Sequence, residues 1–309
     1  MKDTIKGPIA IDEVTSIAGN PQKPNEDNGR AIIRLDEPET AYVALFDGAT
    51  DISGIDYGNK TNPPRFYAQI AADIALHYLE RTPTLHDAAE KTIRTAAQLS
   101  RRYGYVTEET PHHALPTAAG AIGKISVDER SADFYTLADP SIVIQHPDGM
   151  LQCHNGTHST AHLHKAFFES IGANTPELVA AWNASVTHED KLAKHQFVRD
   201  TGMNKPGGYT VFSIHPEIVD QGEIFHVDLQ EGLTHIYVLS DGIMRPVNDY
   251  KTEEGSPLWE LNTLVDKINR SKGYRAIEEL REIENGKTNT PHELKSSDDA
   301  TVIHLTVEI

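Results

Sequence analysis

The chain has 309 residues, 38% of them hydrophobic, and a formal net charge of −18, which argues against nonspecific binding to nucleic acid or to an anionic membrane surface. No apolar run approaches the roughly 20 residues of a membrane span, and the first residues lack the apolar stretch of a signal peptide. The single cysteine, Cys153, excludes an intramolecular disulfide and suits a reducing compartment. Together these features lead us to expect a cytoplasmic protein with no membrane partner.

The first predicted elements are two strands that form a hairpin. Residues 31–35 are rich in β-branched side chains, and residues 41–46 are almost entirely apolar. Residues 36–40 between them contain a proline with acidic flanks, which is typical of a turn.

The hairpin brings two acidic segments together. If it is centred near Glu37-Pro38, antiparallel pairing puts Asp27 opposite Gly48 and Asn28 opposite Asp47, roughly 4.5–5.5 Å apart. A slip of one or two residues leaves the segments neighbours. Two like charges at this distance are costly without a cation between them.

Helices and further strands follow. Pro63-Pro64 opens an amphipathic helix with Phe66, Ile70 and Ile74 on one face, and residues 85–103 predict a second helix. Other strands are expected at 117–127, 132–137, 141–145, 209–214, 224–229, 236–239 and 301–307, and helical stretches at 157–200 and 258–284. Strands, then helices, then strands predict an α+β fold with antiparallel sheets.

Four acidic motifs stand at the ends of apolar runs. Each alone is an ordinary turn or solvated loop, since Asp-Gly pairs mark turns. Carboxylates gathered at one rim are ligands for hard cations such as Mg²⁺ and Mn²⁺. The ordered set therefore points to a metal-dependent hydrolase. The motifs are Asn25-Glu26-Asp27-Asn28, Phe46-Asp47-Gly48-Ala49, Leu239-Ser240-Asp241-Gly242 and Ser297-Asp298-Asp299-Ala300.

In order and separation these motifs resemble those of the metal-dependent protein phosphatases of type 2C, the PPM family, over about residues 17–309. The resemblance implies one phosphatase domain over residues 1–309. It also implies a four-layer α-β-β-α sandwich, in which two antiparallel sheets are flanked by helix pairs. The implied activity is hydrolysis of phosphoserine and phosphothreonine in proteins. A water that bridges two ions would attack phosphorus in line.

The same resemblance assigns roles to residues. Asp47 would bridge two Mn²⁺ or Mg²⁺ ions, and the Gly48 carbonyl would bind one of them. Glu26 and Asp27 would serve the second ion, directly or through water. Asp241 and Asp298 would complete the first ion, and Asp47 and Asp241 would be the catalytic residues. Leu137-Ala138-Asp139 resembles the family's Gly-Asp-Ser strand end, so Asp139 with Asp241 is the candidate for a third ion, although Ala138 replaces the glycine.

Several departures are typical of divergent bacterial members. Gln22 stands where many members have an arginine that grips the phosphate, so Lys23 becomes the candidate for that contact, as a point charge without a bidentate fork. Ala49 and Thr50 stand where many eukaryotic members have a histidine that protonates the leaving group. The family's Arg-Ala-Phe-Gly-Asp-like motif is also missing.

Three functions remain open on the sequence alone. The first is a protein phosphatase that acts on phosphoproteins supplied by a cognate Ser/Thr kinase. The second is a pseudophosphatase that binds a phosphoprotein or a kinase without turnover. The third is a structural protein that binds Ca²⁺ or Zn²⁺.

The segment from His154 to His164 is a separate candidate site. His154, His158 and His162 step by four, so on a helix they would share one face and bind Zn²⁺ or Cu²⁺. The alternative is a solvated start of a helix. Cys153 is not expected to be a nucleophile, because its neighbour His154 would point to the opposite face of a strand.

Overall fold

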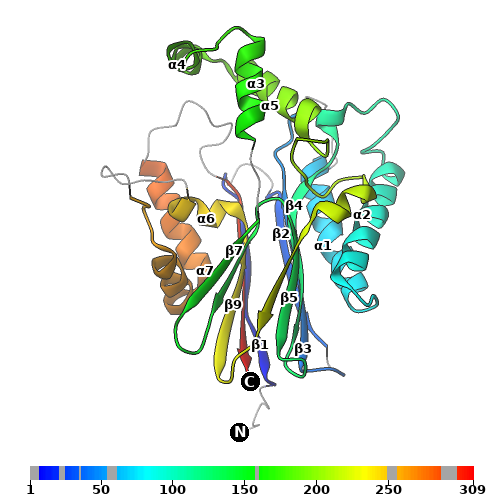
Figure 1. Cartoon of the computed structure of the whole chain (residues 1–309), viewed down its shortest axis with the longest axis vertical. Helices are drawn as coiled ribbons and strands as arrows, with labels where there is room; N and C mark the ends of the chain where they lie inside the picture. The colour runs from blue at the N-terminus through cyan, green and yellow to red at the C-terminus, as the bar shows by residue number, and fades with distance from the viewer. Residues whose placement is uncertain are drawn as a thin grey trace.

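Two five-stranded antiparallel sheets pack face to face and carry helices on their outer faces, as the computed structural model in Figure 1 shows. The structure describes residues 7–20, 25–34, 36–53, 61–156, 160–248, 256–286 and 298–309. The architecture is the four-layer α-β-β-α sandwich that the sequence predicts. None of the helices in these ranges is long and apolar enough to span a bilayer.

The sheets draw their strands from distant parts of the chain. Strand β1 pairs with β10, so the first and last strands of the chain lie side by side. The first sheet has the order β1-β10-β9-β6-β7, with bounds Ile9–Ile17, Ala300–Glu308, Leu233–Leu239, Ser141–Gln145 and Leu151–Asn155. The second has the order β2-β3-β4-β5-β8, with bounds Asp27–Ile33, Thr40–Gly48, Ala118–Ser126, Ser131–Leu137 and Glu223–Asp228.

The core between the sheets follows from the period-two alternation of strand side chains. In β3, Val43 and Leu45 face the other sheet, whereas Tyr42 and Phe46 face the helices behind. Burying such a side chain contributes roughly 1.5–3 kcal/mol. The aliphatic layer between the sheets therefore fixes which residues stand at each strand end.

Helices α1 (Pro63–Leu79) and α2 (Leu85–Arg102) cover the second sheet. Of the face expected for α1, Ile70 and Ile74 are partly buried and pack against the core, and Phe66 is also partly buried. The fully buried face beside them consists of Tyr67 and four alanines, and the small alanine side chains let the helix approach the sheet closely. These residues are Tyr67, Ala68, Ala71, Ala72 and Ala75.

Helices α6 (Asp241–Asn248) and α7 (Leu261–Gly286) cover the first sheet. Two 3₁₀ turns, His112–Ala114 and Pro216–Gln221, precede strands β4 and β8 of the second sheet. Helix α7 has a non-helical residue, Lys272, with φ of 74° and ψ of 154°.

Three further helices project beyond the sheets at the top of Figure 1, and we call them the upper helices. They are α3 (Ala161–Ser170), α4 (Pro176–Ser185) and α5 (His188–Gly202). The helical stretch expected over residues 157–200 is interrupted between these helices: Gly172 has a φ of 77°, and Thr187 and Asp190 form a capping box before α5.

The prediction of a strand at 209–214 is wrong. Within it, only isolated bridges form at Tyr209 and Phe212. The segment leaves a turn with positive φ at Asn204 and Gly207, and Phe212 then packs edge-on against Phe46 at 4.9 Å between ring centroids. Phe212 therefore fills the space under α1 instead of extending a sheet.

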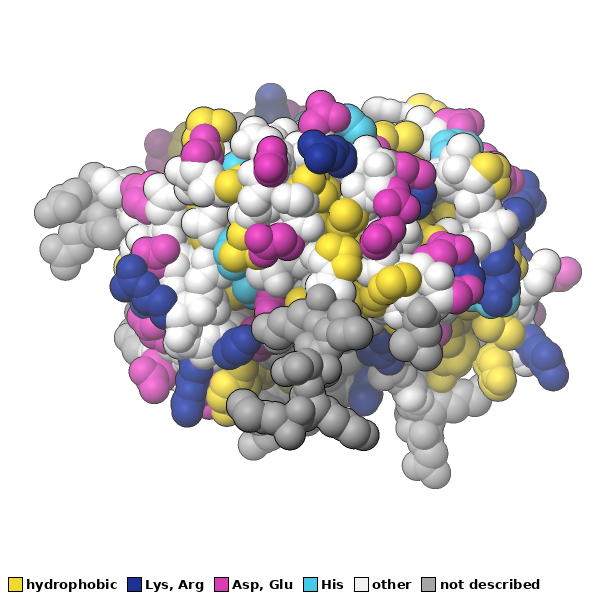
Figure 2. All heavy atoms as spheres, turned by 90° about the horizontal axis from the view of Figure 1, so that it is seen from below, with side chains coloured by type: hydrophobic (Ala, Val, Ile, Leu, Met, Phe, Trp, Pro, Cys, Tyr) yellow, Lys and Arg dark blue, Asp and Glu magenta, His cyan; other side chains and the backbone are white. Residues whose placement is uncertain are grey.

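Figure 2 views the molecule from below, at the end away from the upper helices. Acidic side chains on this face are scattered among basic and apolar ones. This end therefore presents a mixed surface.

Gly242, in the first turn of α6, offers a test of this packing. A Cβ there would lie 1.8 Å from the Asp299 carbonyl oxygen, which is backbone and can yield only if a strand moves. Gly242→Ala should therefore lower the free energy of unfolding by about 1–3 kcal/mol in urea denaturation, as overpacking does. Helix propensity alone would give the opposite sign, about 1 kcal/mol of stabilisation. A variant at least as stable as wild type would contradict the close contact between α6 and β10.

Candidate active site

The hairpin of β2 and β3 delivers the first acidic pair. Asp27 pairs directly with Asp47, one residue away from the expected register. The difference arises in the turn, which closes tightly with the Thr40 N–H donating to the Glu37 carbonyl at 3.0 Å. The Gly48 N–H donates to the Glu26 carbonyl at 3.1 Å, so the two motifs are fastened together at the strand ends.

The other carboxylates arrive at the same end from both sheets. Asp241 follows β9 and Asp298 precedes β10, and these two strands are paired. Asp139 follows β5, after Ala138 with a φ of 71°. That left-handed conformation favours glycine and costs a residue with a Cβ roughly 1–2 kcal/mol. The chain thus keeps a glycine-like backbone at this strand end despite the substitution.

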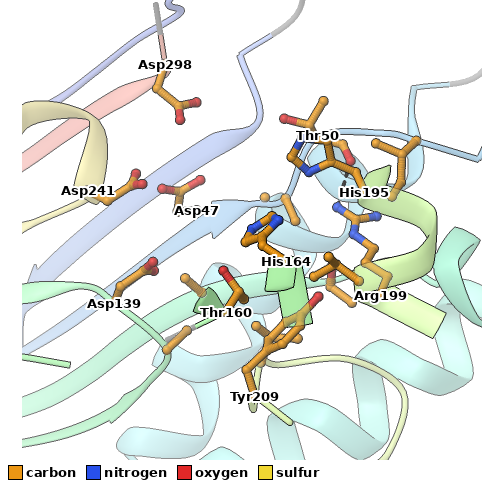
Figure 3. A pocket seen from close by; sticks show the side chains of 18 of the residues that line it. Asp47, Thr50, Asp139, Thr160, His164, His195, Arg199, Tyr209, Asp241 and Asp298 are labelled. Atoms are coloured by element: carbon orange, nitrogen blue, oxygen red, sulfur yellow. Dashed lines mark hydrogen bonds between the residues drawn. The ribbon is translucent and has the colours of Figure 1, made fainter. Parts of the chain in front are cut away.

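These strand ends open into a cavity of about 480 Å³. Asp47, Asp139, Asp241 and Asp298 line one wall, and Figure 3 shows their carboxylates turned toward one another. Gly48 also lines the cavity. Asp27 lies beneath the wall, with 5% of its surface exposed.

Glu26 and Asp299 form hydrogen bonds that hold the segments around this wall in place. The Glu26 carboxylate accepts a hydrogen bond from Asn62 Nδ2 at 2.7 Å. Asp299 is buried and accepts the backbone N–H groups of Gly19 at 2.8 Å and Glu26 at 2.5 Å. Asp298 therefore faces the cavity while Asp299 ties two loops to β10.

The carboxylates share one electrostatic field. Burial raises the pKa of Asp27 to about 7, and the charges of Asp298 and Asp299 add to the effect, while the close approach of Asp47 and Ser240 opposes it. Burial, followed by repulsion from neighbouring carboxylates, also raises the pKa of Asp47 and of Asp241 well above the ordinary range. Such a cluster requires either protons or a cation.

The opposite wall comes from the upper helices and the segment after α5, and sequence reasoning missed it. Figure 3 shows His164, His195 and Arg199 across from the carboxylates, with Thr160 and Tyr209 below them. The spacing of four between His195 and Arg199 puts both on one face of α5, which was the available signal.

Arg199 fastens this wall to the carboxylate side. It is 8% exposed, and its guanidinium donates to the Thr50 carbonyl at 2.7 Å and to the His113 carbonyl at 3.1 Å. Burial lowers its pKa, against attraction from Tyr209, Asp51 and Glu26. Gln196 Nε2 adds a hydrogen bond to the Ile52 carbonyl at 2.8 Å.

Solved structures with this arrangement of elements include Ser/Thr phosphatases. Mycobacterium tuberculosis PstP/Ppp is 13% identical over 97% of this chain and 99% of that chain, with a TM-score of 0.54. The S. agalactiae serine/threonine phosphatase is 12% identical over 97% and 100%, with a TM-score of 0.52. The chain has a PPM-family fold. The catalytic domain of PstP in complex with two manganese ions is 15% identical over 97% and 99%, with a TM-score of 0.51. The sequence matches no family model and no curated protein.

The donor set of the carboxylate wall suits a hard cation. As the side chains stand, no three His, Cys, Asp or Glu donors in the described ranges are grouped closely enough to hold a metal ion. The cavity wall is nevertheless oxygen-only in its ligand chemistry, which suits Mg²⁺ or Mn²⁺. Both carboxylate oxygens of Asp27 are buried without a hydrogen-bond partner, and a cation would satisfy them. The residues present therefore fit such an ion.

The histidine-rich segment does not form the expected metal-binding helix face. His154 lies in strand β7 and His162 in helix α3, so they do not share a helix. His154 stacks on Phe225 at 4.8 Å and lies 3.3 Å from Glu223. Cys153 is exposed. His158, Gln22 and Lys23 lie outside the described residues.

The raised pKa of Asp27 predicts a pH effect on stability without divalent ions. Its stabilising protonation is present below the ordinary pKa of 3.8 and is lost as pH rises through about 7. His195 and His304 oppose this trend, because burial lowers their pKa values to about 3 and about 4. We therefore compare the melting temperatures of wild type and Asp27→Asn, both in EDTA. The contribution of the histidines is the same in both proteins, so it cancels in the difference.

The Asn variant should gain melting temperature relative to wild type as pH rises from 5 to 7.5. A difference that stays constant with pH would show that Asp27 is ionised throughout this range. It would then not share a site with the other carboxylates.

Proposed function

We propose that the chain is a metal-dependent phosphoserine/phosphothreonine protein phosphatase, formed as one domain over residues 1–309. The observation that carries the proposal is the wall of partly buried carboxylates, assembled from both sheets at one end of a PPM-type sandwich. The raised pKa values of Asp47 and Asp241 and the unsatisfied oxygens of Asp27 are what a site built for a cation should have. The proposed substrate is a phosphoprotein made by a cognate Ser/Thr kinase, in the cytoplasm.

Each carboxylate has a proposed role. Asp47 would bridge two Mn²⁺ or Mg²⁺ ions, with the Gly48 carbonyl on one of them. Asp27, and Glu26 through water, would serve the second ion, and Asp241 and Asp298 the first. Asp139 with Asp241 would hold a third ion. When bound, such ions supply an activated water for in-line attack and offset charge on the phosphoryl oxygens.

The protein's own contribution is placement. Strand pairing sets Asp27 against Asp47, and the β9–β10 pair sets Asp241 near Asp298. The cavity of about 480 Å³ has room for a phosphorylated side chain. Lys23, which precedes the acidic pair in the sequence, remains the proposed phosphate contact.

One sequence feature favours a second function, a pseudophosphatase. Gln22 replaces the arginine that many PPM members use to grip phosphate. The chain would then bind a phosphoprotein or kinase without turnover. Hydrolysis of p-nitrophenyl phosphate with added Mn²⁺, and its loss in EDTA, separates the two functions.

Asp47 gives the direct test of the phosphatase. Asp47→Asn keeps the shape of the side chain and removes the charge that would bridge two ions. Turnover of p-nitrophenyl phosphate at saturating Mn²⁺ should fall at least about a hundredfold, since losing that clamp removes several kcal/mol of transition-state stabilisation. Retention of more than a tenth of the wild-type rate would remove Asp47 from the bridging role.

Cys153→Ser is the control for that experiment. Cys153 is exposed on β7 and lies outside the cavity lining. Turnover should be unchanged. A collapse of activity, or a trapped phosphocysteine, would replace the metal mechanism with a thiol mechanism.

Asp298 tests the cluster through stability. Asp298→Asn relieves repulsion with Asp47 and Asp241, so it should melt higher than wild type in EDTA. It should also gain less from Mn²⁺, because a ligand bound only by the native state contributes about 2.7 kcal/mol at a hundredfold excess over Kd and this variant binds more weakly. A variant that is less stable in EDTA and keeps the full Mn²⁺ shift would place Asp298 outside the cation site.

A further inference from the structure

His195 stands out on the wall opposite the carboxylates. It lies on α5 and lines the cavity, and Figure 3 shows its ring beside Thr50 and His164. Its Nε2 atom is buried, and no hydrogen-bond partner for it exists among the described residues. A buried polar atom without a partner costs about 1–3 kcal/mol. The structure therefore holds a costly polar group beside the space that a substrate would enter.

The Lys and Arg side chains that line the cavity are already engaged. The Arg199 guanidinium donates to two backbone carbonyls. The Lys194 ammonium lies over the Trp182 ring, 5.8 Å from its centroid. Arg245, which also lines the cavity, pairs with buried Glu284 at 3.7 Å. His195 thus offers a hydrogen bond that the protein itself does not use.

Burial and neighbouring charges determine the form in which His195 acts. Burial, then the positive charges of Lys194, His164 and Arg199, lower its pKa to about 3. The ring is therefore neutral near neutral pH. In the tautomer that carries its proton on Nε2, a neutral imidazole donates a hydrogen bond without transferring the proton.

The direction of the reaction links this donor to one substrate atom. In an in-line displacement at phosphorus, the attacking and leaving oxygens lie on opposite sides. If the carboxylate wall serves the attacking side, the leaving oxygen points toward the wall formed by α3 and α5. His195 lies on that wall, across from Asp47, Asp139 and Asp241.

We propose that His195 is a substrate-contacting residue whose Nε2–H donates a hydrogen bond to the ester oxygen of the phosphoserine or phosphothreonine side chain. This proposal rests on the proposed phosphatase function. The bond from phosphorus to the alcohol oxygen breaks and a bond from phosphorus to a water oxygen forms. One proton of that water ends on the alcohol, and His195 keeps its own.

Two substrates with different leaving groups test the contact. A phosphothreonine peptide releases an alkoxide that needs stabilisation, whereas p-nitrophenyl phosphate releases a stable phenolate. His195→Leu should lower kcat/KM for the peptide about 10- to 100-fold, the worth of one hydrogen bond to a charged group, and lower it for p-nitrophenyl phosphate less than about threefold. His195→Gln, which places an N–H at similar reach, should restore most of the peptide activity.

His188→Leu is the matched control, because His188 is an exposed histidine at the start of the same helix and does not line the cavity. Melting temperatures of all variants show whether each is folded. Equal losses on both substrates in a folded His195→Leu, or no loss on either, would overturn the contact. So would a Gln variant no better than Leu.

Failure of the proposed function has a different signature. Wild type would then hydrolyse neither substrate at any Mn²⁺ concentration. In that case calorimetry measures binding of the same phosphothreonine peptide. Weaker binding by His195→Leu than by His195→Gln supports the contact, and equal Kd values for both variants and wild type overturn it.

Discussion

The structure is organised around the close approach of like-charged carboxylates. Asp27 and Asp47 stand on directly paired strands, and burial together with repulsion from neighbouring carboxylates raises their pKa values. Side chains on loops would move apart under that repulsion. Here backbone bonds oppose it: the Gly48 N–H holds the Glu26 carbonyl, and buried Asp299 holds the N–H groups of Gly19 and Glu26. Arg281, which pairs with buried Glu284, also donates to the Asp298 carbonyl. The sandwich therefore supplies the rigidity that a cation site of this charge requires.

The assembly of this site needs strands from both ends of the chain. The first and last strands, β1 and β10, pair with each other, and β10 pairs with β9, which precedes Asp241. Asp27 and Asp47 come from the other sheet. Because packing of the two sheets brings the two pairs together, the aliphatic layer that contains Val43, Leu45 and Ile303 determines the spacing of the carboxylates. The repulsion among the carboxylates thus lowers the stability of the fold, whereas burial of the apolar core raises it.

Sequence patterns predicted the parts of this structure that depend on local periodicity. The hairpin, the first two helices and most central strands lie where alternation and helical spacing place them. The β2–β3 register differs by one residue from the centred hairpin, within the slip that the sequence leaves open, because the turn closes at Glu37–Thr40. A prediction failed where tertiary contacts decide. Phe212 packs against Phe46 in a segment that the alternation of side chains alone wrongly predicts as a strand. The motifs marked the carboxylate wall in advance, because each acidic group follows or precedes an apolar run.

The opposite wall could not be read from motifs, because its residues acquire meaning only through contacts far apart in sequence. His195 and Arg199 belong to a helix whose sequence is ordinary and whose exposed residues are polar. What links that helix to the carboxylates is the pair of bonds from Arg199 and Gln196 to the carbonyls of Thr50 and Ile52, in the loop that follows Gly48. A displacement of α5 would therefore pull on the segment next to Gly48. These hydrogen bonds connect the two walls of the cavity. The helix that faces a substrate therefore also positions the backbone beside the carboxylates that would act on it.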